Sequence, residues 1–167
     1  MNLVGVLAVG AMAAHAQQVA SNYVPGTDFS KYKTYKWVVI PGAEVPDQIV
    51  DAEIKQAIDA SLAGKGFTKV TADTADMFVG YQVAVQQERQ WNAYGGMGWR
   101  FGGMASATSS TLSVGTIIVD IYDAKAQQLV WKGESTKTIE PSKNPQKNQE
   151  NIQKAMNKLL KDFPPSK

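Results

Sequence analysis

Residues 76–91 read DMFVGYQVAVQQERQW and carry the clearest secondary-structure signal in the chain. Apolar side chains occupy every second position from Met77 to Val85, and the positions between them are mostly small or polar. Alternation with a period of two predicts a long strand with one buried and one polar face. A sheet covered on only one face is typical of antiparallel architectures.

Four other segments also have strand character. Residues 109–122 are apolar on both faces, which predicts a central strand, and residues 127–140 return after a four-residue turn, which predicts a hairpin. Shorter β-branched and aromatic runs at residues 32–40 and 67–71 complete the set. Together these segments predict a sheet of four to five strands.

Two segments repeat apolar residues at helical spacing, residues 47–63 and residues 148–163. Asp47 is placed to cap the first helix, and Pro164-Pro165 would stop the second. The expected order is β-α-β-β-β-β-α. It predicts an α+β two-layer sandwich, with a mainly antiparallel sheet and both helices on one face.

The first residues differ from the rest of the chain. Residues 3–14 are small and apolar and lead into Ala14-His15-Ala16, which predicts a signal peptide over residues 1–16 with cleavage after Ala16. The apolar run is shorter than the roughly 20 residues that span a bilayer. The expected organisation is therefore a signal peptide, an extended leader over residues 17–27, and a single domain over residues 28–164.

Composition excludes several classes of site. The chain has no cysteine, and its one histidine, His15, lies in the predicted signal peptide. A Ser-His-Asp triad, a thiol nucleophile and a cysteine-based zinc site are therefore excluded from the mature protein. The net charge of +2 is too small to indicate nucleic-acid binding. We expect no enzymatic activity, no cofactor and no metal.

Residues 92–107, NAYGGMGWRFGGMASA, connect two predicted strands and are rich in glycine and aromatic residues. Loops of this length inside a compact domain are usually functional or disordered. The loop could be a flexible hairpin tip or a contact surface, because Trp, Tyr, Arg and Met are enriched at interfaces. A phosphate cradle is disfavoured, since such a loop should open a helix. The candidate contact residues are Trp91, Tyr94, Trp99, Arg100 and Phe101.

Carboxylates offer the remaining acid–base chemistry. Glu88 and Asp120 lie on long strands that are expected to be neighbours. A hydrolase acting on envelope glycans through this pair is the alternative hypothesis, and it requires the two carboxylates at a defined separation.

Several short strings occur together in a characteristic order: DFS at 28–30, YKTYKW at 32–37, KGF at 65–67, VGY at 79–81, VGT at 114–116, DIYD at 120–123 and LVWKG at 129–133, before the C-terminal helix at 154–165. In this the chain resembles the DUF4136 family (domain of unknown function 4136) of bacterial cell-envelope proteins, many of them described as lipoproteins. The resemblance covers about residues 28–164.

The resemblance implies an exported α+β domain in the bacterial envelope and brings no catalytic residues. Gln17, not cysteine, follows the predicted cleavage site, so we expect no lipid anchor and a periplasmic or secreted protein. The expected function is that of a non-enzymatic binding or structural module whose partner is an envelope protein or another envelope component.

Overall fold

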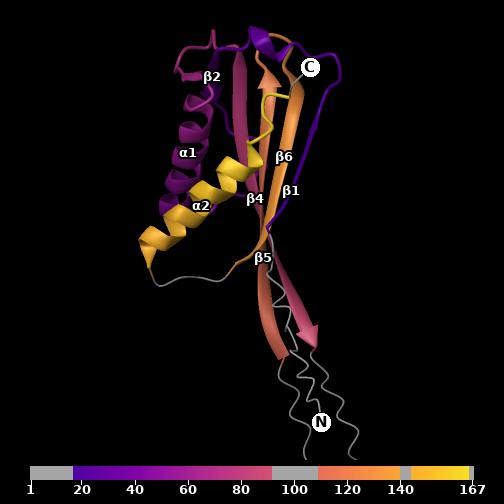
Figure 1. Ribbon diagram of the computed structural model, residues 1–167, viewed down its shortest axis with the longest axis vertical. Helices are drawn as coiled ribbons and strands as arrows, with labels where there is room; N and C mark the ends of the chain where they lie inside the picture. The colour runs from indigo at the N-terminus through magenta and orange to yellow at the C-terminus, as the bar shows by residue number, and fades with distance from the viewer. Residues whose placement is uncertain (1–16, 92–108, 140–143, 166–167) are drawn as a thin grey trace, which may run out of the picture.

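The computed structural model describes residues 17–91, 109–139 and 144–165, with side chains over 17–84, 115–137 and 144–165. Two helices cover one face of a sheet, and both lie on the same side of it (Figure 1). The elements in chain order are β1 (Gln18–Tyr23), a short helix η1 (Phe29–Lys31), β2 (Thr34–Trp37), α1 (Gln48–Ala63), β3 (Thr68–Lys69), β4 (Met77–Trp91), β5 (Ser109–Asp123), β6 (Gln128–Ile139) and α2 (Pro145–Leu159).

The sheet has six strands in the order β1-β6-β5-β4-β2-β3, and it is mixed. The α+β class is confirmed, but the expectation of four to five mainly antiparallel strands is wrong in number and direction. β2 runs parallel to both β3 and β4. The physical reason is α1, because a helical crossover returns the chain so that the next strand runs in the same direction.

The additional strand is β1, which lies within the expected extended leader. It pairs with β6 from Gln18 opposite Thr136 to Tyr23 opposite Trp131. Five of its six residues are exposed, so its sequence lacks the apolar alternation that reveals the other strands. Only its pairing with β6 identifies it as part of the sheet.

Helix positions follow from caps and apolar stripes. The Asp47 carboxylate accepts hydrogen bonds from the Ile49 and Val50 amides at 2.9 and 3.2 Å, which confirms the predicted N-cap of α1. α2 begins earlier than expected, because Asn144 is its N-cap and Pro145 occupies the first turn. The fully or nearly fully buried residues of the two helices are Ile54, Ala57, Ile58, Leu62, Met156 and Leu159.

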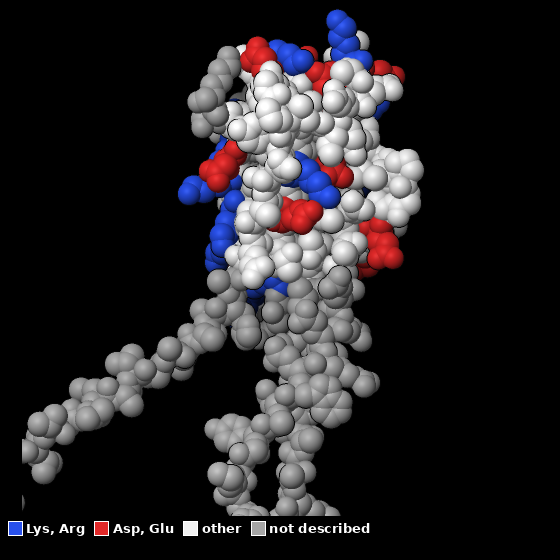
Figure 2. Space-filling view, turned by 90° about the vertical axis from the view of Figure 1, so that its right-hand side faces the viewer, with Lys and Arg blue, Asp and Glu red and all other residues white. Residues whose placement is uncertain are grey.

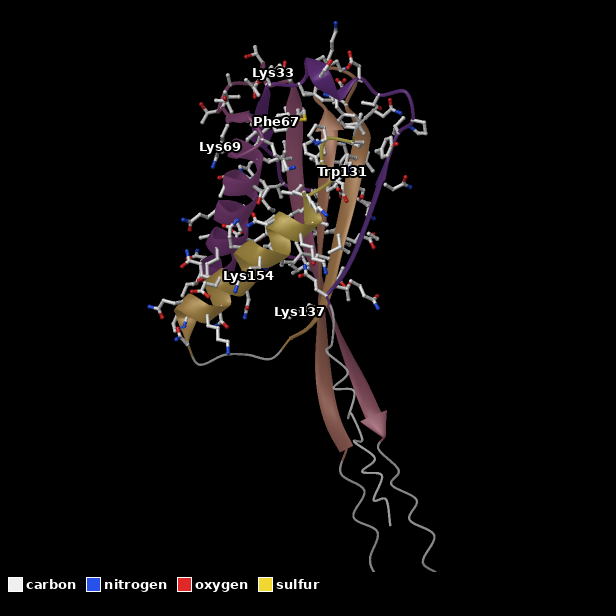
Figure 3. The ribbon with its side chains drawn as sticks, in the orientation of Figure 1. Lys33, Phe67, Lys69, Trp131, Lys137 and Lys154 are labelled. Atoms are coloured by element: carbon white, nitrogen blue, oxygen red, sulfur yellow. The ribbon has the colours of Figure 1, made fainter. Side chains whose placement is uncertain are left out.

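The core lies between these helices and one face of the sheet. Met77, Val79 and Tyr81 are buried as the alternation predicts, opposite residues of β5 that include Val119 and Ile121. On β6, Gly133 allows the Trp131 indole to lie over the backbone, since a Cβ at this position would collide with that ring and with Leu159. Phe163, just beyond α2, packs edge-on against Trp131 at 5.2 Å between ring centroids. Phe67 and Trp131, both labelled in Figure 3, contact Phe163 from different elements.

Candidate binding surface

β4 and β5 extend beyond the rest of the sheet as a two-stranded ribbon (Figure 1). They pair continuously from Met77 opposite Asp123 to Trp91 opposite Ser109. β6 accompanies β5 only as far as Ser113. The last four pairs therefore project from the body by roughly 13 Å at the usual rise per residue. Lys137 lies close to the point where the ribbon leaves the body (Figure 3).

The side of β4 that faces β2 is paired only in its first half. The Val38 amide donates to the Val79 carbonyl, and the Val83 amide donates to the Glu44 carbonyl, both at 2.9 Å. Backbone groups of alternate residues point to the same side of a strand. Those of residues 85, 87, 89 and 91 therefore face this edge, and within the described ranges no backbone partner is found for them.

Exposed apolar side chains occur in the segment that runs along β4 and in the helix that follows it. The segment between β2 and α1 follows β4 and carries Val39 and Val45, which are 89% and 55% exposed. Ile49, in the first turn of α1, is 73% exposed. An open strand edge bordered by exposed apolar side chains is typical of a surface that binds another protein.

The predicted contact residues fall at or beyond the end of the ribbon. Trp91 is the last residue of β4, opposite Ser109. Tyr94, Trp99, Arg100 and Phe101 lie outside the described residues, so the contact surface stays a prediction. The segment that holds them connects two antiparallel strands, which removes the strand-to-helix setting that a phosphate cradle needs.

The carboxylate pair of the alternative hypothesis is not brought together. Asp120 lies opposite Gly80, whereas Glu88 lies opposite Leu112, eight residues further along the same ribbon. That offset corresponds to roughly 26 Å along the strands. Glycosidases hold their two carboxylates within about 10 Å. The hydrolase that depends on Glu88 and Asp120 is therefore excluded by the strand register.

Asp120 is unusual for another reason. It lies on the sheet face away from the helices, yet it is only 6% exposed. Gly80 opposite it has no side chain, and Ile40 from the segment after β2 lies directly over that glycine. Its Oδ1 atom is buried and has no hydrogen-bond partner within the described ranges. Burial raises the pKa of the Asp120 carboxyl, although the positive charge of Lys132 opposes the shift.

The rest of that face carries no patch of a single charge sign among the described residues. Figure 2 views the molecule from the side away from the helices and shows mostly uncharged residues, with acidic and basic side chains interspersed. Lys132 and Glu134 form an ion pair there at 3.3 Å, both partly exposed. Exposed pairs of this kind contribute little to stability, so they do not mark a site by themselves.

The opposite end of the molecule holds a polar cavity of about 410 Å³. Asp123 lines it and accepts hydrogen bonds from the Lys31 ammonium, the Tyr32 hydroxyl and two backbone amides, at 2.7–2.9 Å. The bond from Lys31 holds the pKa of Asp123 well below its usual range. Asp76 accepts three hydrogen bonds from Lys33 and Thr34. Both carboxylates are occupied in joining η1 and β2 to the sheet, which is a structural role.

The part of the chain that the structure describes contains neither a cluster of metal-ligating side chains nor a helix able to span a membrane. No group of three or more Asp, Glu, His or Cys side chains is arranged to hold a metal ion. None of the helices there combines the length and the apolar composition that crossing a bilayer requires.

Sequence reasoning missed the open edges and the buried Asp120. Val39 and Val45 could have indicated an exposed apolar surface, since the connection between a strand and a helix is usually polar. Nothing in the sequence indicates that β4 continues past the end of β2, or that Ile40 covers Gly80.

Comparison with known proteins places this fold in a family. The sequence profile of a domain of unknown function, DUF4136, matches residues 19–165. The chain belongs to the DUF4136 family. No curated protein matches the chain.

Solved structures share the DUF4136 fold at low sequence identity. A PDZ domain protein from Parabacteroides distasonis is 14% identical with a TM-score of 0.59, and the match covers 90% of this chain but only 37% of that one. A PelC dodecamer from Paraburkholderia phytofirmans is 12% identical with a TM-score of 0.53, over 87% of this chain and 95% of PelC. These similarities establish a common fold.

Proposed function

We propose that this DUF4136 protein is an exported, non-enzymatic module of the bacterial cell envelope, and that it binds an envelope protein through the hairpin of β4 and β5. The observation that carries the proposal is the ribbon that projects beyond β6 and β2. Two strands alone are marginally stable in water, so extending them past the sheet gives the fold no evident benefit. Contact with a partner would account for it.

The chemistry of the hairpin supports a protein partner. The proposed contact residues are Trp91, Tyr94, Trp99, Arg100 and Phe101. Trp, Tyr and Arg dominate binding energy at interfaces, because they combine large apolar area with hydrogen-bonding groups. Export rests on the apolar run and the Ala-x-Ala site of residues 1–16.

The test uses the chain from Gln17 to Lys167 as bait in a periplasmic extract, followed by mass spectrometry. Replacing Trp99, Arg100 and Phe101 with alanine should reduce capture of the specific partner at least tenfold, since each interface anchor contributes about 1–2 kcal/mol or more. The urea midpoint should stay unchanged.

The matched control is the double variant Lys33→Ala/Lys125→Ala. Both lysines are exposed and lie at the opposite end of the molecule from the ribbon. Undiminished capture by the triple alanine variant, or equal loss in the lysine control, would count against the hairpin as the contact surface.

A further inference from the structure

We infer that copies of this chain associate with one another by strand addition, with the free edge of β1 in one copy pairing with the free edge of β4 in the next. This assembly goes beyond the proposed function and does not depend on the tip residues. Its basis is that the outer side of β1 and the half of β4 beyond Val83 are both unpaired within the described ranges, and that they are different surfaces of the same sheet.

The first edge is β1. The Val24 amide donates to the Val130 carbonyl at 3.0 Å, so the backbone groups of even-numbered residues face β6. Those of Val19 and Ser21 point outward from the sheet, as does the Tyr23 amide, which donates to Oδ1 of Asn22 at 2.9 Å. Natural edge strands are normally protected by charged residues, proline or a bulge. β1 reads QVASNY and pairs with β6 in an unbroken register, so it has none of these protections.

The second edge is the half of β4 beyond Val83, residues 84–91. Residues 84–91 span roughly 26 Å, and the six residues of β1 span roughly 20 Å. The open stretch is thus long enough to accept all of β1. It carries one acidic and one basic residue, Glu88 and Arg89, so its net charge does not repel an uncharged strand.

The exposed apolar side chains favour a second copy over an unrelated peptide. Of the six large apolar residues that are exposed within the described ranges, Tyr23 and Val24 lie at the end of β1, and Val45 follows Glu44, whose carbonyl accepts from the Val83 amide where the open stretch of β4 begins. Both halves of an apolar contact are therefore present on this one chain.

The strand directions bring these two halves together. β1 is antiparallel to β6, β6 to β5, and β5 to β4, so β1 runs opposite to β4. When two copies share one orientation, an antiparallel β1–β4 pair places the Tyr23 end of β1 next to Val83, where Val45 lies. Because the two edges are different surfaces, the contact is heterologous and continues to further copies, in a ring or a filament.

Sedimentation of the chain from Gln17 to Lys167 should show a mass above the monomer that rises with concentration. Ser21→Pro and Val85→Pro each remove an outward amide without removing a bond of the existing ladder, and each should return the mass to that of the monomer. Ser21→Thr and Val85→Ile keep the amide and should still associate.

The double variant Tyr23→Lys/Val45→Lys provides a second route if the proline variants fail to fold. It leaves the backbone donors in place but sets two positive charges against each other across the contact, and it should also yield monomers. A monomeric native chain at every concentration would overturn the inference.

Cross-linking tests the pairing directly, because the chain has no cysteine. Ser21→Cys is mixed in turn with Val85→Cys, Gln87→Cys or Arg89→Cys to cover the possible registers, and oxidised. A covalent dimer is expected from at least one mixture, whereas Ser21→Cys mixed with Lys65→Cys should give none. No cross-link in any of the three mixtures would contradict the β1–β4 pairing.

The two proposals fail separately. Alanine at Trp99, Arg100 and Phe101 should leave the assembled mass unchanged, even where it abolishes partner capture. Loss of assembly in this tip variant would show that the tip, and not the β1 and β4 edges, holds the copies together, and would overturn the inference.

Discussion

At the scale of single residues, Asp120 is an ionisable side chain that the fold buries, although burial disfavours its charged form. The carboxylate is buried opposite Gly80, which Ile40 covers, it has one oxygen without a hydrogen-bond partner within the described residues, and burial raises its pKa. A group whose pKa is higher in the folded state stabilises the fold when protonated, and this contribution is lost as the pH rises through that value. At neutral pH the wild type therefore carries a penalty.

Asp120→Asn should raise the free energy of unfolding at pH 7 by about 1 kcal/mol, because a neutral amide avoids the cost that burial imposes on an ionisable carboxyl group. The gain should shrink as the pH falls and approach zero below about 4, where the carboxyl of the unfolded chain is also protonated. Urea unfolding of both proteins between these pH values measures the difference. Asp162→Asn, at an exposed position, serves as the control, and a destabilised Asp120→Asn would mean that attraction to Lys132 outweighs burial.

At the scale of elements, α1 depends on a cap that the sequence announces. The Asp47 carboxylate satisfies two amides of the first turn, which have no partner within the helix. The cap also fixes where the segment carrying Val39 and Val45 turns into the helix. The Asp47 cap thus helps to position Val45, which lies beside the proposed β4 interface.

Asp47→Ala should lower the free energy of unfolding by about 1 kcal/mol, the usual cost of losing an N-cap. Thermal unfolding followed by circular dichroism measures it. Asp47→Asn keeps an acceptor oxygen and should remain close to the wild type. Equal losses in both variants would indicate that charge, and not the capping hydrogen bonds, stabilises this end of the helix.

At the scale of the whole molecule, β1 joins the start of the described chain to its last helix. The Gln17 side chain donates to the Ser135 hydroxyl at 2.6 Å, and the Lys158 ammonium donates to the Gln17 carbonyl at 2.9 Å. Val19 packs against the core. Although β1 is exposed over most of its residues, it covers the edge of β6 and becomes the outermost strand on that side of the sheet.

Removing residues 17–23 should therefore destabilise the domain by about 2 kcal/mol or more, because it strips β6 of six paired residues and uncovers its edge. Urea unfolding of chains that begin at Gln17 and at Val24 measures the loss. Equal midpoints would mean that β1 is a passive leader, as its sequence first suggests.

Prediction from sequence succeeded where the signal was local and periodic. The alternation around Val79 and the stripe of Ile54 and Ile58 report burial directly, because a strand or helix exposes one face at a fixed spacing. It failed for β1, whose position at the edge of the sheet leaves no apolar alternation. The hypothesis that joined Glu88 and Asp120 depended only on their strands being neighbours, and the register of β4 and β5 separates the two residues by eight positions.

The sequence by itself determined the α+β class, the DUF4136 membership, both helices, the Asp47 cap and the three long strands, since each depends on residues close together in the chain. Only the tertiary structure decided the rest: the parallel β2–β4 pair, β1 as a sixth strand, the burial of Asp120 and the two open edges. Those features depend on which strand lies beside which and on where each pairing ends. Backbone hydrogen bonds between distant segments form both, and the apolar pattern of one segment reports which of its faces is buried but not which strand lies beside it or where that pairing ends.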